Sequence, residues 1–274
     1  AVAGYGKTLA DYTTYGNIYQ PCAALAPAAA LTEVSIYNYI ALTAMTARAT
    51  ARCDGLAAKG LVSGATTAER AADALAKLRA VGWTADNDSM HNAHYALGNG
   101  PILSAMYPMA YGRFGVDANL CNASFAAVSL TGDVVVATPT ALAQSFATAN
   151  GTANGTPAGV VYNNSVGGAK AWQFAMSPST GVADFGLDNA LCQHALVSGK
   201  DAVTGAALTA ASTPTKADSD KVRAGIAEVL HSANLRGKPT IIVAGRSDAL
   251  VPVNNNARAY TALNRSIEGA ASKL

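Results

Sequence analysis

Residues 237–253 read GKPTIIVAGRSDALVPV and carry most of the fold information in the chain. Thr240 to Ala244 are apolar or β-branched and lie between Pro239 and Gly245, which is typical of a short strand buried on both faces. Asp248 follows directly. Open α/β sheets keep their working residues just past the carboxyl ends of such strands. The pattern predicts one unit of a parallel sheet with a carboxylate at its working edge.

Asp248 has two interpretations. In α/β-hydrolases the acid that orients the catalytic histidine occupies such a turn, and the chain order is Ser, then Asp, then His. We therefore interpret Asp248 as that acid. Alternatively, Asp248 only caps the turn before Leu250, because Asp often bonds its own backbone in turns.

The residues after the turn favour the hydrolase interpretation. Asn254 to Asn256 precede a predicted helix over 257–263, and an Asn amide is available as its N-cap. Strand, turn and helix form half of a parallel-sheet repeat. The sequence ends where the next strand is expected, and the histidine of the Ser-Asp-His order would follow that strand.

Composition excludes several classes of function. The 274 residues carry a net charge of +2 with no basic run, which gives no support to a nucleic-acid surface. No segment has the roughly 18–20 apolar residues that cross a bilayer. No glycine-rich phosphate loop occurs, so no nucleotide cofactor is expected. Low charge and many small polar residues suit an exported bacterial protein, either secreted or periplasmic.

The start of the sequence lacks an initiator Met, a basic leader and a long apolar stretch. We therefore expect it to be a processed or trimmed piece.

Four cysteines, Cys22, Cys53, Cys121 and Cys192, are widely separated and form no zinc-binding spacing. An even number permits two disulfides in three connectivities. We favour Cys22–Cys53 with Cys121–Cys192, since each pair would tie successive elements together. Four buried free thiols are the alternative.

Helical periodicity dominates the sequence before residue 236. Helices are predicted from Pro21, from Thr32 to about Asp54, from Thr66 or Thr67 to Gly82, from about Asp86 to Leu97, and over 102–111, 184–197 and 216–235. Short strands are possible at 134–137 or 159–162, and 199–214 is a predicted loop. A lone parallel strand cannot fold by itself. Its partners are therefore either hidden earlier in the chain or absent from it.

Ser165 is the best candidate for a nucleophile within the chain. It lies in Asn163-Asn-Ser-Val-Gly-Gly168, which has the downstream glycines of a Gly-x-Ser-x-Gly elbow but Asn163 in place of the first glycine. A plain Asn/Ser/Gly loop explains the same residues.

The histidines give no complete site. His91 and His94 share a predicted helix face, but no third metal ligand is visible, so packing or surface roles are favoured over metal binding. All four histidines precede Asp248, and none fits the Ser-Asp-His order. The four are His91, His94, His194 and His231.

Several long strings in this sequence resemble the D-(−)-3-hydroxybutyrate oligomer hydrolases. The resemblance extends over the whole chain and is weakest from about Leu130 to Thr156. The strings are YTTYGNIYQPCAALA at 12–26, RCDGLAAKG at 52–60, residues 237–253 quoted above, and LNRSIEGAASKL at 263–274.

The resemblance implies a serine hydrolase that cuts short 3-hydroxybutyrate esters released from poly(3-hydroxybutyrate). Family members are longer than this chain. Their serine would precede Ala1 and their histidine would follow Leu274, so Asp248 is the one triad position present. Neither a cofactor nor a metal is implied. The partners are the small oligomeric substrate and the remainder of the polypeptide, without nucleic acid or membrane.

The expected fold is therefore an α/β-hydrolase-like parallel sheet, partly represented, with a large mainly helical cap. Residues 1–19 would be a remnant of the core, 20–235 the cap, and 236–274 the core segment with the acid turn. Alone, this piece is expected to be inactive. Two other functions stay open: a capped esterase of the tannase or feruloyl-esterase type, and a non-catalytic binding or structural domain.

Overall fold

The computed structural model describes residues 9–27, 45–90, 99–115, 117–129, 133–140, 158–164, 175–184, 186–248 and 251–274. Within these ranges it contains seven α-helices and one two-stranded sheet. The helices are α1 (Leu9–Ala23), α3 (Met45–Ala58), α4 (Thr67–Ala80), α6 (Asn99–Tyr111), α8 (Gly186–Ser198), α9 (Lys216–Glu228) and α10 (Ala257–Glu268). The strands are β1 (Ala123–Ala127) and β2 (Ala158–Tyr162), and short 3₁₀ turns lie at η1 (Ala85–Met90), η2 (Leu120–Asn122) and η3 (Gly269–Ala271).

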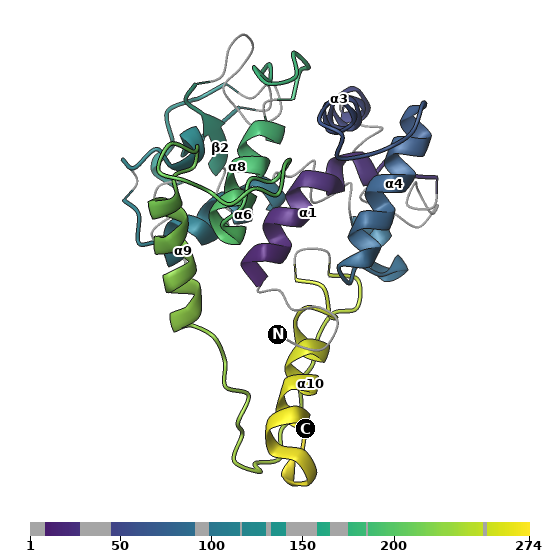
Figure 1. Cartoon of the computed structure of the whole chain (residues 1–274), viewed down its shortest axis with the longest axis vertical. Helices are drawn as coiled ribbons and strands as arrows, with labels where there is room; N and C mark the ends of the chain where they lie inside the picture. Colours follow the sequence, from purple (N-terminus) through teal and green to yellow (C-terminus); the bar gives the residue numbers. More distant parts are fainter. Residues whose placement is uncertain are drawn as a thin grey trace.

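Helix α1 is the centre of the molecule. It packs against α3 and α4 on one side and against α6 and α8 on the other (Figure 1). Tyr12 and Cys22 of α1 belong to a buried cluster with Leu56 of α3, Leu78 of α4 and Leu187 of α8. Small residues allow these close approaches: a Cβ at Gly16 would lie 2.8 Å from the Trp83 ring.

A buried arginine replaces a hydrogen bond that Pro21 removes from α1. Pro21 has no N–H, so the carbonyl of Asn17 four residues earlier loses its helical donor. Arg52 of α3 supplies one, since its Nη1 donates to that carbonyl at 2.6 Å. The same guanidinium donates from Nε and Nη2 to the carboxylate of Asp184, and both side chains are only 1% exposed. One charge pair thus joins α1, α3 and the residues before α8.

Both favoured disulfides are present. Cys22–Cys53 links α1 to α3, and Cys121–Cys192 links η2 to α8. The alternative of four free thiols is excluded. The predicted pairing is thus confirmed, although the bridged cysteines lie 31 and 71 residues apart and the second bridge does not join successive elements.

Helices α6, α8 and α9 pack together as a layer beside the two-stranded sheet. Met109 of α6, Leu196 of α8 and Val222 of α9 share one buried cluster. The strands β1 and β2 pair antiparallel, with Ala123 opposite Tyr162. Strand β2 confirms the predicted strand at 159–162, whereas no strand forms at 134–137 and β1 was not predicted.

The prediction of a parallel α/β-hydrolase-like sheet is wrong for the described structure. Its only sheet is the antiparallel β1–β2 pair. The segment 240–244 is extended but belongs to no strand, and Ile241 and Val243 are 90% and 92% exposed. The apolar pattern identifies residues that favour burial, but it does not supply the neighbouring strands that a parallel sheet requires.

Candidate active site

The turn that carries Asp248 rests on η1. Asn87, a buried residue of η1, donates from Nδ2 to the carbonyl of Asp248 at 2.7 Å and reaches the carbonyl of Arg246 at 3.4 Å. Arg246 in turn donates from Nε to Asp86 at 3.2 Å. The amide of Asn87 thus holds the backbone of the turn against η1, whereas the Arg246–Asp86 pair joins only exposed side chains.

The asparagines after the turn attach it to the end of α4. Asn254 donates from Nδ2 to the carbonyl of Gly82 at 2.8 Å, and Asn255 donates to that of Val81 at 3.1 Å. The expected side-chain N-cap of the following helix is absent, since Asn256 holds that position without a capping hydrogen bond. Two of the three amides therefore join distant segments rather than start α10.

The carboxylate of Asp248 is exposed, and its Oδ1 accepts a hydrogen bond from the backbone N–H of Val251 at 2.9 Å. This is the local turn contact that the simpler interpretation of Asp248 expects. A catalytic acid can also use such a bond for orientation. The catalytic role of Asp248 therefore stays a prediction.

Tyr12 lies close enough to Asp248 for the charge of the aspartate to act on its phenol. Burial raises the pKa of the Tyr12 phenol, and the negative charge of Asp248 raises it further. Its ring stacks on Trp83 at a centroid distance of 5.2 Å, and its hydroxyl has no hydrogen-bond partner among the described residues. A neutral phenol beside the acid turn is thus built into the helical body.

The sequence alone did not single out Asn87 or Tyr12 as part of this turn. Asn87 and Asp248 are 161 residues apart, and no local spacing rule connects them. Tyr12 begins the string at 12–26 that resembles the family, but that resemblance does not predict which residues Tyr12 contacts.

The other candidate residues either lie outside the described ranges or have known contacts elsewhere. Ser165, His91 and His94 lie outside the described residues. His194 shares a hydrogen bond of 3.0 Å with the Thr14 hydroxyl and packs edge-on against Tyr15. His231 packs edge-on against Tyr260. The contacts found for these two histidines thus involve residues other than Asp248.

The described ranges hold neither a cluster of metal-binding side chains nor a helix suited to cross a membrane. Across them, no three His, Cys, Asp or Glu side chains gather where they could hold a metal ion. None of the helices in the same ranges combines the length and apolar character needed to cross a membrane.

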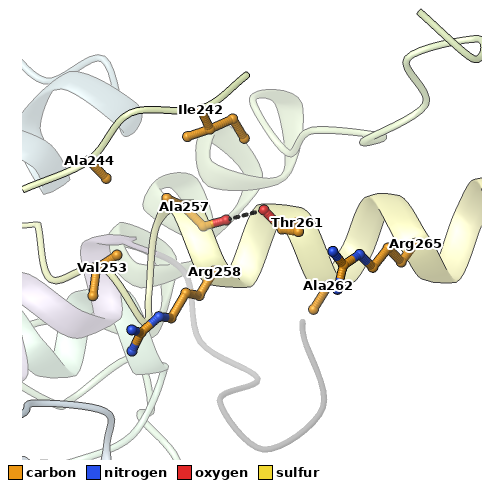
Figure 2. A pocket seen from close by; sticks show the side chains of 8 residues that line it. All are labelled: Ile242, Ala244, Val253, Ala257, Arg258, Thr261, Ala262 and Arg265. Carbon is orange, nitrogen blue, oxygen red and sulfur yellow. Dashed lines mark hydrogen bonds between the residues drawn. The ribbon is translucent and has the colours of Figure 1, made fainter. Parts of the chain in front are cut away.

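An open groove of about 670 Å³ lies between the 242–244 segment and α10. Figure 2 shows Ile242 and Ala244 on one wall and the side chains of α10 on the other. The lining is mostly apolar, with two arginines on the helix. The full set is Ile242, Ala244, Val253, Ala257, Arg258, Thr261, Ala262 and Arg265.

The comparison with known families gives a clear match. The family described as 3HB-oligomer hydrolase (3HBOH) matches residues 1–274, which is the whole sequence. This chain belongs to the 3HB-oligomer hydrolase family. The resemblance seen in the four sequence strings is thereby confirmed.

Curated relatives in the 3HB-oligomer hydrolase family carry the name D-(−)-3-hydroxybutyrate oligomer hydrolase. The protein of Albidiferax ferrireducens is 41% identical over all of this chain and 36% of its own length. Those of Polaromonas naphthalenivorans and Cupriavidus necator are 40% and 39% identical over the whole chain, which covers 36% and 35% of them. The chain thus spans about a third of the length of these relatives. No solved structure matches it.

Proposed function

We propose that the protein containing this chain hydrolyses short linear esters of 3-hydroxybutyrate to monomers. The observation that carries the proposal is the family match over the entire chain, together with relatives named for this activity at about 40% identity. Because the chain covers only 36% of the first of these relatives, the activity belongs to the longer protein.

The proposed reaction is acyl transfer through a serine. A histidine takes the serine proton as the hydroxyl attacks the ester carbonyl, and it then protonates the departing alcohol. Water, activated by the same histidine, cleaves the acyl-enzyme. We place the serine and the histidine in polypeptide outside this chain.

Asp248 is the proposed acid of this triad. Its carboxylate would accept a hydrogen bond from the histidine, fix the imidazole tautomer and stabilise the imidazolium. Two features are compatible with the role: the exposed side chain can be reached by other polypeptide, and Asn87 holds the backbone of the turn in place. The body that carries α1 to α9 would then act as a lid over the acid turn.

Replacing Asp248 by Asn in the full-length protein tests this role. We expect turnover of 3-hydroxybutyrate dimers and trimers to fall by on the order of 10⁴, as for the corresponding aspartate of a serine protease. The KM should change little, because the acid acts on the chemical step. Circular dichroism and melting would show whether the variant folds.

Asp86→Asn is the matched control. Asp86 is a neighbouring exposed carboxylate that pairs with Arg246 of the same turn. We expect this variant to keep turnover within a few-fold, since exposed ion pairs contribute little. If the folded Asp248→Asn protein were as active as the control, Asp248 would be removed from the triad.

Two further measurements test substrate and nucleophile. Turnover of linear 3-hydroxybutyrate dimers should exceed that of aromatic esters; a preference for the aromatic esters would defeat the substrate assignment in favour of a tannase-like enzyme. A fluorophosphonate probe should label the full-length protein outside residues 1–274. Labelling inside them would make Ser165 the first candidate nucleophile.

We also propose that the protein works outside the bacterial cytoplasm, either secreted or periplasmic. The two disulfides support this location, because such bridges persist in oxidising compartments and are rare in the cytosol. Cell fractionation of the native organism tests it.

A further inference from the structure

The side chain of Asn87 is a buried link between the helical body and the turn that carries Asp248. Its Oδ1 accepts from the backbone N–H of Thr84 at 2.7 Å and from the Thr84 hydroxyl at 3.2 Å. On the other side, Nδ2 donates to the carbonyl of Asp248 at 2.7 Å and reaches that of Arg246 at 3.4 Å. Donors thus face one end of the amide and acceptors the other, so only one orientation of the amide satisfies both.

The end of this link that belongs to the body is bonded to α4. Arg79, in the last turn of α4, donates from Nη1 to the carbonyl of Thr84 at 2.9 Å. Its Nη2 forms an ion pair with Asp88, the residue directly after Asn87. Because the hydrogen-bond partner and the chain neighbour of Asn87 are both bonded to α4, the amide has a defined position relative to the helical body.

The backbone and the side chain of Asp248 are held by different groups. Asn87 binds the backbone carbonyl, whereas Oδ1 of the carboxylate accepts from the backbone N–H of Val251 at 2.9 Å. The first contact bears on where the residue lies, and the second on how its carboxylate points. In enzymes, a displacement of about 1 Å at the reacting groups can cost on the order of 100-fold in rate. The position of this backbone therefore matters if the carboxylate serves the reaction.

We propose that Asn87 is a positioning residue: its amide places the acid relative to the helical body, so that Asp248 meets the catalytic histidine in the productive geometry. The proposal rests on the triad role proposed for Asp248. Asn87 acts through the backbone of Asp248 and touches no reacting atom. Asn254 offers a contrast within the chain, since its Nδ2 donates to the carbonyl of Gly82 at 2.8 Å and tethers the same end to the body at a residue beyond the turn.

Asn87→Ala in the full-length protein tests the proposal, with Asn254→Ala as the matched control. Each substitution removes an amide that links this end of the chain to the body. We expect Asn87→Ala to lower the kcat for 3-hydroxybutyrate dimers by roughly 10- to 100-fold and to leave the KM unchanged, because the acid serves the chemical step. Asn254→Ala should keep the parental kcat. Melting temperatures of both variants measure the cost of each tether to folding.

The same substitution in the Asp248→Asn background separates positioning from a general structural role. If Asn87 acts through the acid, its removal should cause no further loss of kcat once the carboxylate is gone, because residues that act as a unit are not additive. An equal fold-loss in the two backgrounds would overturn the proposal. So would a rise in KM alone, or a fall in kcat for Asn254→Ala as large as that for Asn87→Ala.

Asn87→Asp keeps the proposal testable if the alanine variant fails to fold. This variant retains an oxygen for the Thr84 N–H, but it presents a second oxygen, which cannot donate, to the carbonyls of Arg246 and Asp248. It should lose kcat in the same way, and parental kcat would contradict the positioning role. Failure of the proposed function is distinguishable: an active Asp248→Asn protein removes the triad role itself. An inactive Asp248→Asn protein beside fully active Asn87 variants removes only the positioning role.

Discussion

Single residues in this protein compensate for defects that the sequence itself introduces. Pro21 removes a donor from the last turn of α1, and Arg52 replaces that donor from another helix while its charge is balanced by Asp184. The pair is almost fully buried. Such a pair contributes little beyond what apolar residues would give, but breaking it leaves one charge without a partner. The arginine is thus required mainly because the aspartate and the proline are present.

Arg52→Met is therefore expected to destabilise the protein by about 3–5 kcal/mol, since it leaves Asp184 buried and unpaired. The double variant Arg52→Met with Asp184→Leu should recover a large part of that loss. Urea unfolding followed by circular dichroism measures both.

The control is Arg70→Met. Arg70 pairs with Asp54, but these side chains are 24% and 44% exposed. Its removal should cost no more than about 1 kcal/mol. A similar cost for Arg52→Met and Arg70→Met would contradict the structural role assigned to the buried pair.

At the scale of elements, local signals predicted helices well wherever the caps are local. Helix α4 begins where the Thr66 and Glu69 pattern placed it, and α6 and α8 lie close to the predicted ranges. The prediction was wrong where tertiary contacts decide. Pro21 was expected to open a helix, but it lies inside one that ends at Ala23, because Arg52 satisfies the freed carbonyl.

Helix α9 shows the opposite error. It was predicted to reach residue 235 but ends at Glu228, so Val229 and Leu230 are exposed rather than buried. The helical spacing of apolar residues in α9 continues beyond the part of the helix that packs against other helices. Periodicity could not predict where α9 ends, because the sequence of α9 does not contain the lengths of the helices that pack against it.

The capping box of α4 gives a prediction about pH. Glu69 accepts hydrogen bonds from the backbone N–H groups of Thr66 and Ala65, at 2.9 and 2.8 Å, and these bonds lower the pKa of Glu69 below its ordinary value of 4.5. A lowered pKa in the folded state gives stability that is present above pH 4.5 and lost as the pH falls through the folded value. Glu69→Gln should therefore show a shallower loss of stability below pH 4.5 than the parent.

Thr66→Ala serves as the control for this experiment. It removes the other half of the box, the hydroxyl that accepts from the Glu69 N–H at 3.2 Å. Stability should fall by roughly 1 kcal/mol at neutral pH. The acid-dependent loss should persist, because the carboxylate keeps its backbone donors. Unfolding free energies between pH 7 and 3 would separate the two effects, and identical pH profiles for the parent and Glu69→Gln would contradict the assignment.

The whole molecule divides into a helical body and a lightly attached end. The disulfides lie before residue 230, and so do the three buried clusters found among the described residues. The attachment uses a few side-chain amides, among them Asn87, Asn254 and Asn255. The sequence correctly placed a turn followed by a helix at this end, but the strand predicted over 240–244 is not formed. It could not predict their surroundings, because the apolar pattern of 240–244 is the same whether or not other strands are present to bury it.

Limited proteolysis of the 274-residue chain should reveal this division. We expect thermolysin, which cuts before aliphatic residues, to cleave first at Ile241, Ile242 or Val243. The described residues offer the backbone of this segment no hydrogen bond, so it is available to a protease with little local unfolding. Mass spectrometry should then find a fragment that keeps both disulfides and resists further digestion.

The loop over 199–214 provides an internal comparison, because Val203 within it is also exposed, at 37%. Its backbone is held differently: Asp201 pairs with Ala206, and Leu208 donates to the carbonyl of Gly199 at 3.1 Å. These bonds must open before the loop fits a protease site, so cleavage at Val203 should be slower. Equal or earlier cleavage at Val203 would mean that 240–244 is already covered within this chain, and the division into body and end would have to be given up.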